Sequence, residues 1–65
     1  MERWGDYQDI IFTKDGNEYR GRYRTSNDGM LEVEFGAGSK RAMLHASPAH
    51  VLARIMVLEL AQEER

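Results

Sequence analysis

Apolar and charged residues alternate along two short segments near the middle of the chain. In residues 19–25 an arginine stands at every second position, and in residues 31–35 a glutamate does the same. The charged residues of this pattern are Arg20, Arg22, Arg24, Glu32 and Glu34. Because successive side chains of a strand point to opposite faces of a sheet, each segment presents one charged and one apolar face. The pattern predicts two strands of a half-buried sheet.

Glycine-containing turn sequences divide the first part of the chain into three predicted strands, at residues 7–13, 18–25 and 30–36. Asp15-Gly16 and Asn27-Asp28-Gly29 separate these strands. Glycine accepts the positive φ that tight hairpin connections require. Two successive hairpins are therefore expected.

Apolar pairing sets the register of the first hairpin. A two-residue loop at its turn places Phe12 opposite Tyr19 and Ile10 opposite Gly21. It also places Asp9 opposite an arginine. In the adjoining hairpin we expect an aromatic side chain, Phe35, to cover the strand glycine, which has no side chain of its own.

Charge pairing sets the register of the second hairpin. A three-residue loop places Arg24 opposite Glu32 and Arg22 opposite Glu34, whereas a two-residue loop would place Arg24 opposite Val33. Opposite charges across a strand pair are favourable, so we expect the longer loop. The charged face of the sheet then neutralises itself.

Beyond the third strand the sequence predicts a connection and a helix. Residues 36–39 are rich in glycine and are expected to form a flexible connection, and residues 40–45 form either a short fourth strand or an irregular segment. Ser47-Pro48 is typical of a helix start, because serine caps the first amides and proline loses no hydrogen bond there. The helix is expected to run from residue 48 to about residue 63.

These elements define the expected fold. We predict one small α+β domain over residues 1–65, an antiparallel three- to four-stranded β-meander with one C-terminal α-helix packed on one face. The chain has no repeat, no low-complexity tract and no linker long enough to divide it.

The predicted helix carries two apolar stripes at about 100° per residue. The first contains Val51, Ile55 and Leu58. The second contains Leu52, Met56 and Leu60. A helix that is apolar over more than half its circumference is expected to be buried on more than one side. We therefore assign the second stripe to a protein partner or to self-association, so that Met56→Glu would weaken a dimer without unfolding the monomer. The alternatives are that the sheet curls around the helix, or that the N-terminal segment with Trp4 folds across it.

Length and composition narrow the class of protein. A chain of 65 residues buries only ~60% of its unfolded surface, which disfavours a deep enzyme cleft. There is no cysteine and no long apolar run, so we expect a cytoplasmic protein without disulfides, membrane segment, metal or cofactor. The net charge of −2, from 11 acidic and 9 basic residues, offers no overall attraction for nucleic acid.

Local basic groups leave anion binding as an alternative. Arg20, Lys40 and Arg41 are candidate contacts for a nucleic acid or another anion, since basic side chains contact phosphates. The tyrosines near the arginines face the other side of the sheet, so no stacking platform forms beside them. The Gly36-x-Gly38-Ser39-Lys40 segment resembles a phosphate-binding loop, but no helix follows it directly, as such a loop requires.

Catalytic and metal chemistry have little support in the sequence. His45 and His50 are the only histidines, and no carboxylate or cysteine lies between them to complete a metal site. Ser47 is better used as a helix cap than as a nucleophile. We expect no enzymatic activity.

From Gly21 onward the order of short motifs resembles a small family of uncharacterised bacterial proteins. The matching motifs are Gly21-Arg22-Tyr23, Gly29-Met30-Leu31-Glu32-Val33, Gly38-Ser39-Lys40, Ser47-Pro48, Leu52-Ala53-Arg54 and Glu59-Leu60. They cover roughly the C-terminal two-thirds of the chain. The resemblance implies a small antiparallel sheet followed by one C-terminal helix, and it carries over no activity and no functional residue.

Overall fold

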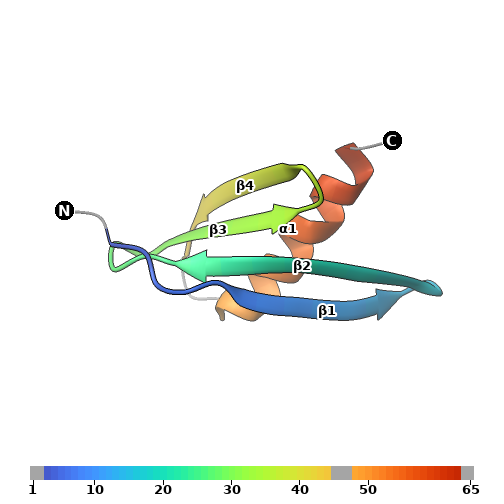
Figure 1. Cartoon of the computed structure of the whole chain (residues 1–65), viewed down its shortest axis with the longest axis horizontal. Helices are drawn as coiled ribbons and strands as arrows, with labels where there is room; N and C mark the ends of the chain where they lie inside the picture. Colours follow the sequence, from blue (N-terminus) through green and yellow to red (C-terminus); the bar gives the residue numbers. More distant parts are fainter. Residues whose placement is uncertain (1–2, 45–47, 64–65) are drawn as a thin grey trace.

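Four antiparallel strands and one helix make up the part of the chain that the computed structural model describes, residues 3–44 and 48–63. The elements are β1 (Gln8–Lys14), β2 (Asn17–Thr25), β3 (Met30–Phe35), β4 (Gly38–Met43) and α1 (Ala49–Glu63). The sheet order is β1-β2-β3-β4, so each strand pairs with its neighbours in sequence (Figure 1). The predicted α+β meander is confirmed, and the fourth strand is formed.

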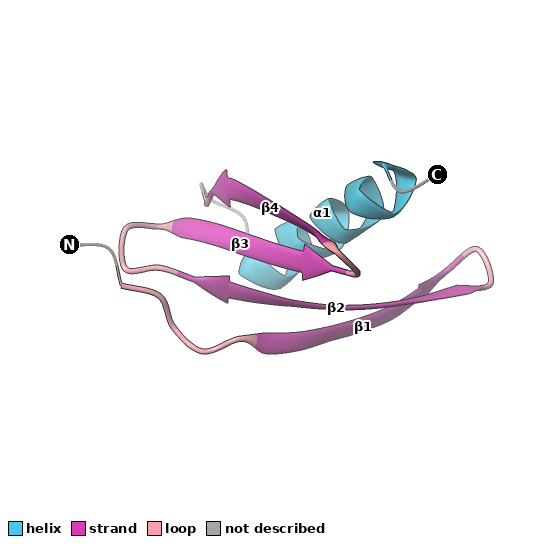
Figure 2. Ribbon diagram, turned by 45° about the horizontal axis from the view of Figure 1, so that its top comes forward, coloured by secondary structure: helices cyan, strands magenta, loops and turns pink. Residues whose placement is uncertain are grey.

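The helix packs on one face of the sheet, and within the described residues no helix covers the other face (Figure 2). It packs mainly over β3 and also contacts the other three strands. Its first backbone bonds run from the amides of Val51 and Leu52 to the Pro48 carbonyl, at 3.1 and 3.3 Å. The serine predicted to cap it, Ser47, lies outside the described residues.

Both predicted hairpin registers are confirmed. In the first, Phe12 lies opposite Tyr19 and Ile10 opposite Gly21. In the second, the strand partners are Arg22 with Glu34, Tyr23 with Val33, Arg24 with Glu32 and Thr25 with Leu31. Apolar and charge pairing were therefore sufficient to set the register of these three strands.

Backbone conformation at the turns explains their residues. Asp15 and Gly16 have φ of 52° and 81°, the left-handed pair that a two-residue hairpin turn needs to match the strand twist. At the second turn Gly29 has φ of 83°. There the Ser26 Oγ accepts hydrogen bonds from the amides of Asp28 and Met30, at 3.3 and 3.1 Å.

The connection between β3 and β4 is tighter than predicted. Phe35 pairs directly with Gly38, which leaves a two-residue turn at Gly36 and Ala37 rather than a flexible linker. Gly36 supplies the left-handed conformation, with φ of 59°. The strand alternation therefore continues unbroken into β4 and decides which way its basic residues point.

The N-terminal segment extends the sheet instead of crossing the helix. Trp4 forms an isolated antiparallel bridge with Ser26, and the Gly5 amide donates to the Thr25 carbonyl at 2.9 Å. Trp4 lies over arginines of the helix-free face. The alternative in which this segment buries the surplus apolar surface of the helix is therefore not adopted.

The core lies between β3 and the helix. Its buried apolar residues are Ile10, Leu31, Val33, Ala53, Met56, Val57 and Leu60. Aromatic residues extend it towards the β1–β2 turn, where the Phe12 and Tyr19 rings stack with centroids 5.2 Å apart. Phe35 joins them at 6.2 Å from Tyr19, and the side chains nearest to Gly21 are those of Val57 and Ile10. Val57 of the helix thus contributes to the cover of the strand glycine.

Gly21→Ala is expected to destabilise the fold. A Cβ at this position would lie 2.7 Å from the Glu34 carbonyl oxygen and 3.4 Å from Val57 Cγ2. The backbone of β3 would have to move, with a cost of ~1–3 kcal/mol, typical of overpacking. Urea denaturation measures this cost. Gly5→Ala is the control, because its Cβ would meet only an ordinary 3.5 Å contact; equal stabilities of the two variants would contradict the prediction.

Candidate interaction surfaces

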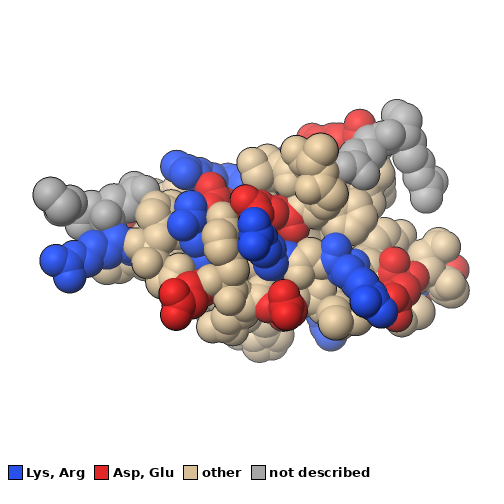
Figure 3. All heavy atoms as spheres, viewed as in Figure 1, with Lys and Arg blue, Asp and Glu red and all other residues tan. Residues whose placement is uncertain are grey.

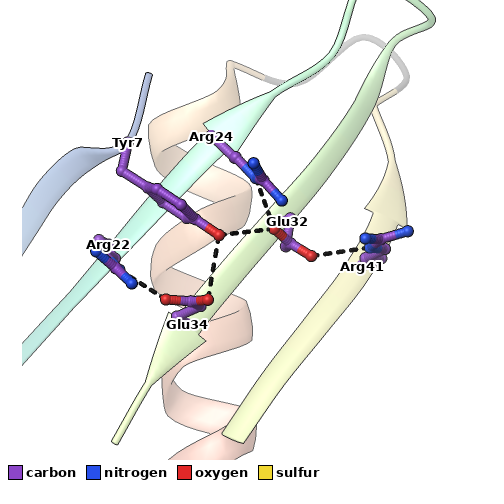
Figure 4. A network of polar contacts seen from close by, with 6 residues as sticks. All are labelled: Tyr7, Arg22, Arg24, Glu32, Glu34 and Arg41. Carbon is purple, nitrogen blue, oxygen red and sulfur yellow. Dashed lines mark hydrogen bonds and ion pairs between the residues drawn. The ribbon is translucent and has the colours of Figure 1, made fainter. Parts of the chain in front are cut away.

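The helix-free face of the sheet carries a connected polar network (Figure 4). Its members are Tyr7, Arg22, Arg24, Glu32, Glu34 and Arg41. Glu32 is at its centre, with only 7% of its surface exposed. Its Oε1 accepts from Arg24 Nε at 2.6 Å and from the Tyr7 hydroxyl at 2.8 Å, and its Oε2 accepts from Arg41 Nε at 2.9 Å. This one carboxylate links β2, β3, β4 and the segment preceding β1.

Glu34 forms a second, more exposed centre. Its Oε1 accepts from Arg22 Nε at 2.6 Å, and its Oε2 lies 3.1 Å from the Tyr7 hydroxyl. A phenol has one hydrogen to donate, so the Tyr7 hydroxyl shares that hydrogen between two carboxylates that would otherwise repel each other. The strand alternation predicted the two arginine–glutamate pairs across β2 and β3.

Two aromatic rings cover the arginines of this network. The Arg22 Cζ lies 4.2 Å from the centroid of the Tyr7 ring, and the Arg24 Cζ lies 4.7 Å from the ring centroids of both Tyr7 and Trp4. Arg41 lies 5.2 Å from the Trp4 centroid. Such cation–π contacts strengthen as the cation loses water. The rings therefore act as partial cover for a face that no helix protects.

The pKa of Glu32 reflects its surroundings. Burial alone would raise the pKa of this carboxyl, but hydrogen bonds donated by Tyr7, Arg41 and Arg24 outweigh burial and lower its pKa from 4.5 to about 2. Burial raises the pKa of Tyr7, and its hydrogen bonds to Glu32 and Glu34 act in the same direction. Tyr7 thus stays protonated and Glu32 ionised across the physiological range.

The three predicted anion contacts are not brought together. Lys40 points to the helix side of β4, where its Nζ lies 3.3 Å from Glu63 and 3.6 Å from Glu59. Arg41, its neighbour in sequence, points to the opposite face and binds Glu32. Arg20 pairs with Glu18 at 2.7 Å. Adjacent residues of a strand face opposite ways, so the Lys40-Arg41 pair is divided between the two faces.

Charges of opposite sign alternate over the helix-free face. Figure 3 shows acidic and basic side chains interspersed over the strands, with no broad basic area on the side in view. The hydrogen bond to Glu34 raises the pKa of Arg22, and the hydrogen bond to Glu63 raises the pKa of Lys40. Each of these cations is already stabilised by a carboxylate of the same chain.

The structure also changes the assignment of the two helix stripes. Met56 and Leu60, assigned to self-association, lie in the core, with Met56 only 3% exposed, and Leu52 packs at the edge of the core. Val51 and Ile55 remain 42% and 50% exposed. The helix therefore does carry a surplus apolar stripe, but it is the other one. We call Val51, Ile55 and Leu58 the outer stripe.

A shallow groove of about 300 Å³ continues the outer stripe towards the β1–β2 turn. Leu58 lines it from the helix, and Tyr19 and Lys14 line it from the hairpin. The groove holds no cluster of catalytic side chains. It extends the surface beside the outer stripe rather than forming a separate enclosed cavity.

The described residues offer no other recognisable site. In the described ranges, 3–44 and 48–63, no group of three histidine, cysteine, aspartate or glutamate side chains is placed to hold a metal ion. His45 lies outside those ranges. The helix of the described part of the chain is too short and too polar to cross a membrane.

No family model, no curated protein and no solved structure matches this chain. The sheet followed by a C-terminal helix, which the resemblance from Gly21 onward implied, is the order observed. The function of this chain is therefore inferred from its fold and its surfaces.

Proposed function

We propose that this protein is a small, non-enzymatic protein–protein interaction module of the cytoplasm that self-associates through the outer stripe of α1. The supporting observation is the half-exposure of Val51 and Ile55, one helical turn apart, on a helix whose opposite side already fills the core. Exposed apolar side chains that adjoin one another mark association surfaces, whereas scattered ones are ordinary. The absence of cysteine from the sequence supports the cytoplasmic location.

Among the described residues, the other large apolar side chains that are exposed do not form a comparable surface. Ile11 and Met43 are 59% and 58% exposed, but they lie on β1 and β4, at opposite edges of the sheet. Between them stands the polar network centred on Glu32. Two isolated side chains separated by charges give a partner little continuous apolar area.

Anion binding is less well supported by the geometry. The candidate cations Arg20, Lys40 and Arg41 each pair with a carboxylate of the chain, and they occupy two faces. A phosphate would have to compete with these carboxylates. Absence of oligonucleotide binding at low salt would exclude this function.

Ile55→Glu is expected to dissociate the dimer without unfolding the protein. The side chain is half-exposed, so the monomer tolerates the charge, whereas an apolar interface does not. Removing this apolar contact from both copies is expected to raise the dissociation constant at least about tenfold. Sedimentation velocity over a concentration series measures the change, and circular dichroism confirms that the fold is retained.

Ile11→Glu is the matched control. It makes the same substitution at a similarly exposed isoleucine on the other side of the sheet, and it should leave the dissociation constant unchanged. If the unmodified protein sediments as a strict monomer at high micromolar concentration, self-association is refuted. If Ile55→Glu and Ile11→Glu raise the dissociation constant equally, the interface is not formed by the outer stripe.

A further inference from the structure

Two charged residues of opposite sign lie on opposite flanks of the outer stripe. The Arg54 guanidinium lies on the β1 side, with its Cζ 5.6 Å from the centroid of the Phe12 ring. The Glu59 carboxylate lies on the β4 side, with Oε2 3.6 Å from Lys40 Nζ. Because β1 and β4 are the two edges of the sheet, the stripe has one basic flank and one acidic flank.

The spacing of these residues matches that of a short coiled coil. Val51, Ile55, Leu58 and Gln62 succeed one another by four, three and four positions, as alternating d and a positions do. In this register Arg54 occupies a g position and Glu59 the following e position. A g residue and the e residue five positions later in the partner form the interhelical ion pairs of parallel coiled coils.

Symmetry decides which charges would meet. In a parallel pair the two-fold axis runs along the helices, so the basic flank of one copy faces the acidic flank of the other. In a face-to-face antiparallel pair the axis crosses the helices, so each flank faces its own equivalent. The parallel arrangement therefore places opposite charges together, and the antiparallel one places Arg54 on the same side as the second Arg54.

We infer that the occupant of the outer stripe is a second copy of this chain with its helix parallel to the first, and that Arg54 pairs with the partner subunit's Glu59. This inference rests on the proposed self-association and specifies its geometry. The two helices lie in the middle and the two sheets lie outside, with the polar networks facing away from the interface. Glu59 then lies between Lys40 of its own chain and Arg54 of the other.

Single cysteines provide a direct test, because the natural chain has none. Gln62→Cys and Val51→Cys are prepared separately, oxidised separately, and oxidised as a mixture. A parallel pair places residue 62 against residue 62 and residue 51 against residue 51, so each variant is expected to form a disulfide-linked dimer with itself. An antiparallel pair places residue 51 against residue 62, so only the mixture would cross-link efficiently.

The outcomes separate the orientation from the association itself. Cross-linking of each variant with itself supports the parallel pair. Cross-linking in the mixture alone overturns the parallel geometry but leaves self-association intact. Cross-linking of neither, with the unmodified protein monomeric in sedimentation, overturns both. If neither cysteine variant cross-links but the unmodified protein sediments as a dimer, the interface lies outside the outer stripe.

Charge exchange gives an independent readout. Arg54→Glu and Glu59→Arg each place like charges together at both symmetric pairs, and each is expected to weaken the dimer about tenfold. The double variant restores opposite charges and is expected to return the dissociation constant to near the original value. Exchange of Glu18 and Arg20, an exposed ion pair on the hairpin, is the control and should change nothing. Additive weakening in the double variant would refute the pairing of Arg54 with Glu59.

Discussion

Replacing Met56 with glutamate is expected to unfold the protein. Met56 is 3% exposed and packs in the core with Leu31, Val33 and Val57. A carboxylate buried there without a partner costs several kcal/mol, while the smallest domains have only about 5 kcal/mol of stability to lose. Loss of the far-ultraviolet circular dichroism signal and collapse of amide dispersion in the NMR spectrum would show the unfolded state.

The adjacent residue is the most informative comparison for this prediction. Ile55→Glu makes a similar change one position along the same helix, but on its exposed side, and should leave the protein folded. If Met56→Glu instead remains folded and becomes monomeric, Met56 belongs to the interface and the helix is rotated about its axis so that Met56 faces away from the sheet. The two variants together thus show which side of the helix faces the sheet in solution.

Glu32→Gln is expected to cause the second largest loss, about 3 kcal/mol at neutral pH. A shift of the pKa from 4.5 to about 2 corresponds to roughly 3 kcal/mol at ~1.4 kcal/mol per pKa unit. The variant keeps the size of the side chain but loses the negative charge that Arg24 and Arg41 share. Thermal or urea denaturation measures the difference, and Glu18→Gln, at an exposed hairpin pair, is the control with little expected effect.

The same carboxylate predicts a specific dependence on pH. Because the pKa of Glu32 is lower in the folded state, its contribution is fully present above about pH 4.5 and is lost as the pH falls towards 2. The stability difference between the natural protein and Glu32→Gln should therefore shrink over this window. A difference that stays constant from pH 6 to pH 2.5 would show that Glu32 does not act through its charge.

Strand pairing was predictable because it depends on local rules. The alternation of Arg22 and Arg24 with apolar residues, and of Glu32 and Glu34 with apolar residues, allows one register that pairs both charges and apolar side chains. A slip by one residue would reverse the faces of a strand. The two hairpin turns are marked by residues that accept positive φ. Their positions fixed the loop lengths and therefore the register of each strand pair.

The rotation of the helix was not predicted, although the sequence contains a signal for it. Both stripes are apolar, so a comparison of the two alone does not decide between them. Ala53 and Val57, omitted from the predicted stripes, join Met56 and Leu60 in the i, i+3, i+4, i+7 spacing of a buried face. Counting the small residue Ala53 as part of that face would have placed it against the sheet.

The contacts of Trp4 and Arg41 were missed for a different reason. Trp4 reaches the polar network through an isolated bridge to Ser26. A single bridge of this kind leaves no alternating pattern in the sequence from which it could be predicted. Arg41 was predicted as an anion contact next to a flexible connection at residues 36–39, whereas the two-residue turn at Gly36 and Ala37 continues the strand alternation and directs Arg41 to Glu32. Long-range contacts of single residues depend on loop lengths, which sequence patterns determine least well.

The helix-free face of the sheet would limit the size of the proposed assembly. Its arginines and carboxylates satisfy one another, and Trp4 and Tyr7 shield them. Its exposed apolar residues, Ile11 and Met43, lie at opposite edges, so the face gives a second molecule little continuous surface to bind. An interface related by a two-fold axis uses the same patch on both copies and leaves no further patch open. Association through the helix, as proposed, would therefore stop at two copies, and the polar network, although distant from the proposed interface, would keep the assembly from growing into an open chain.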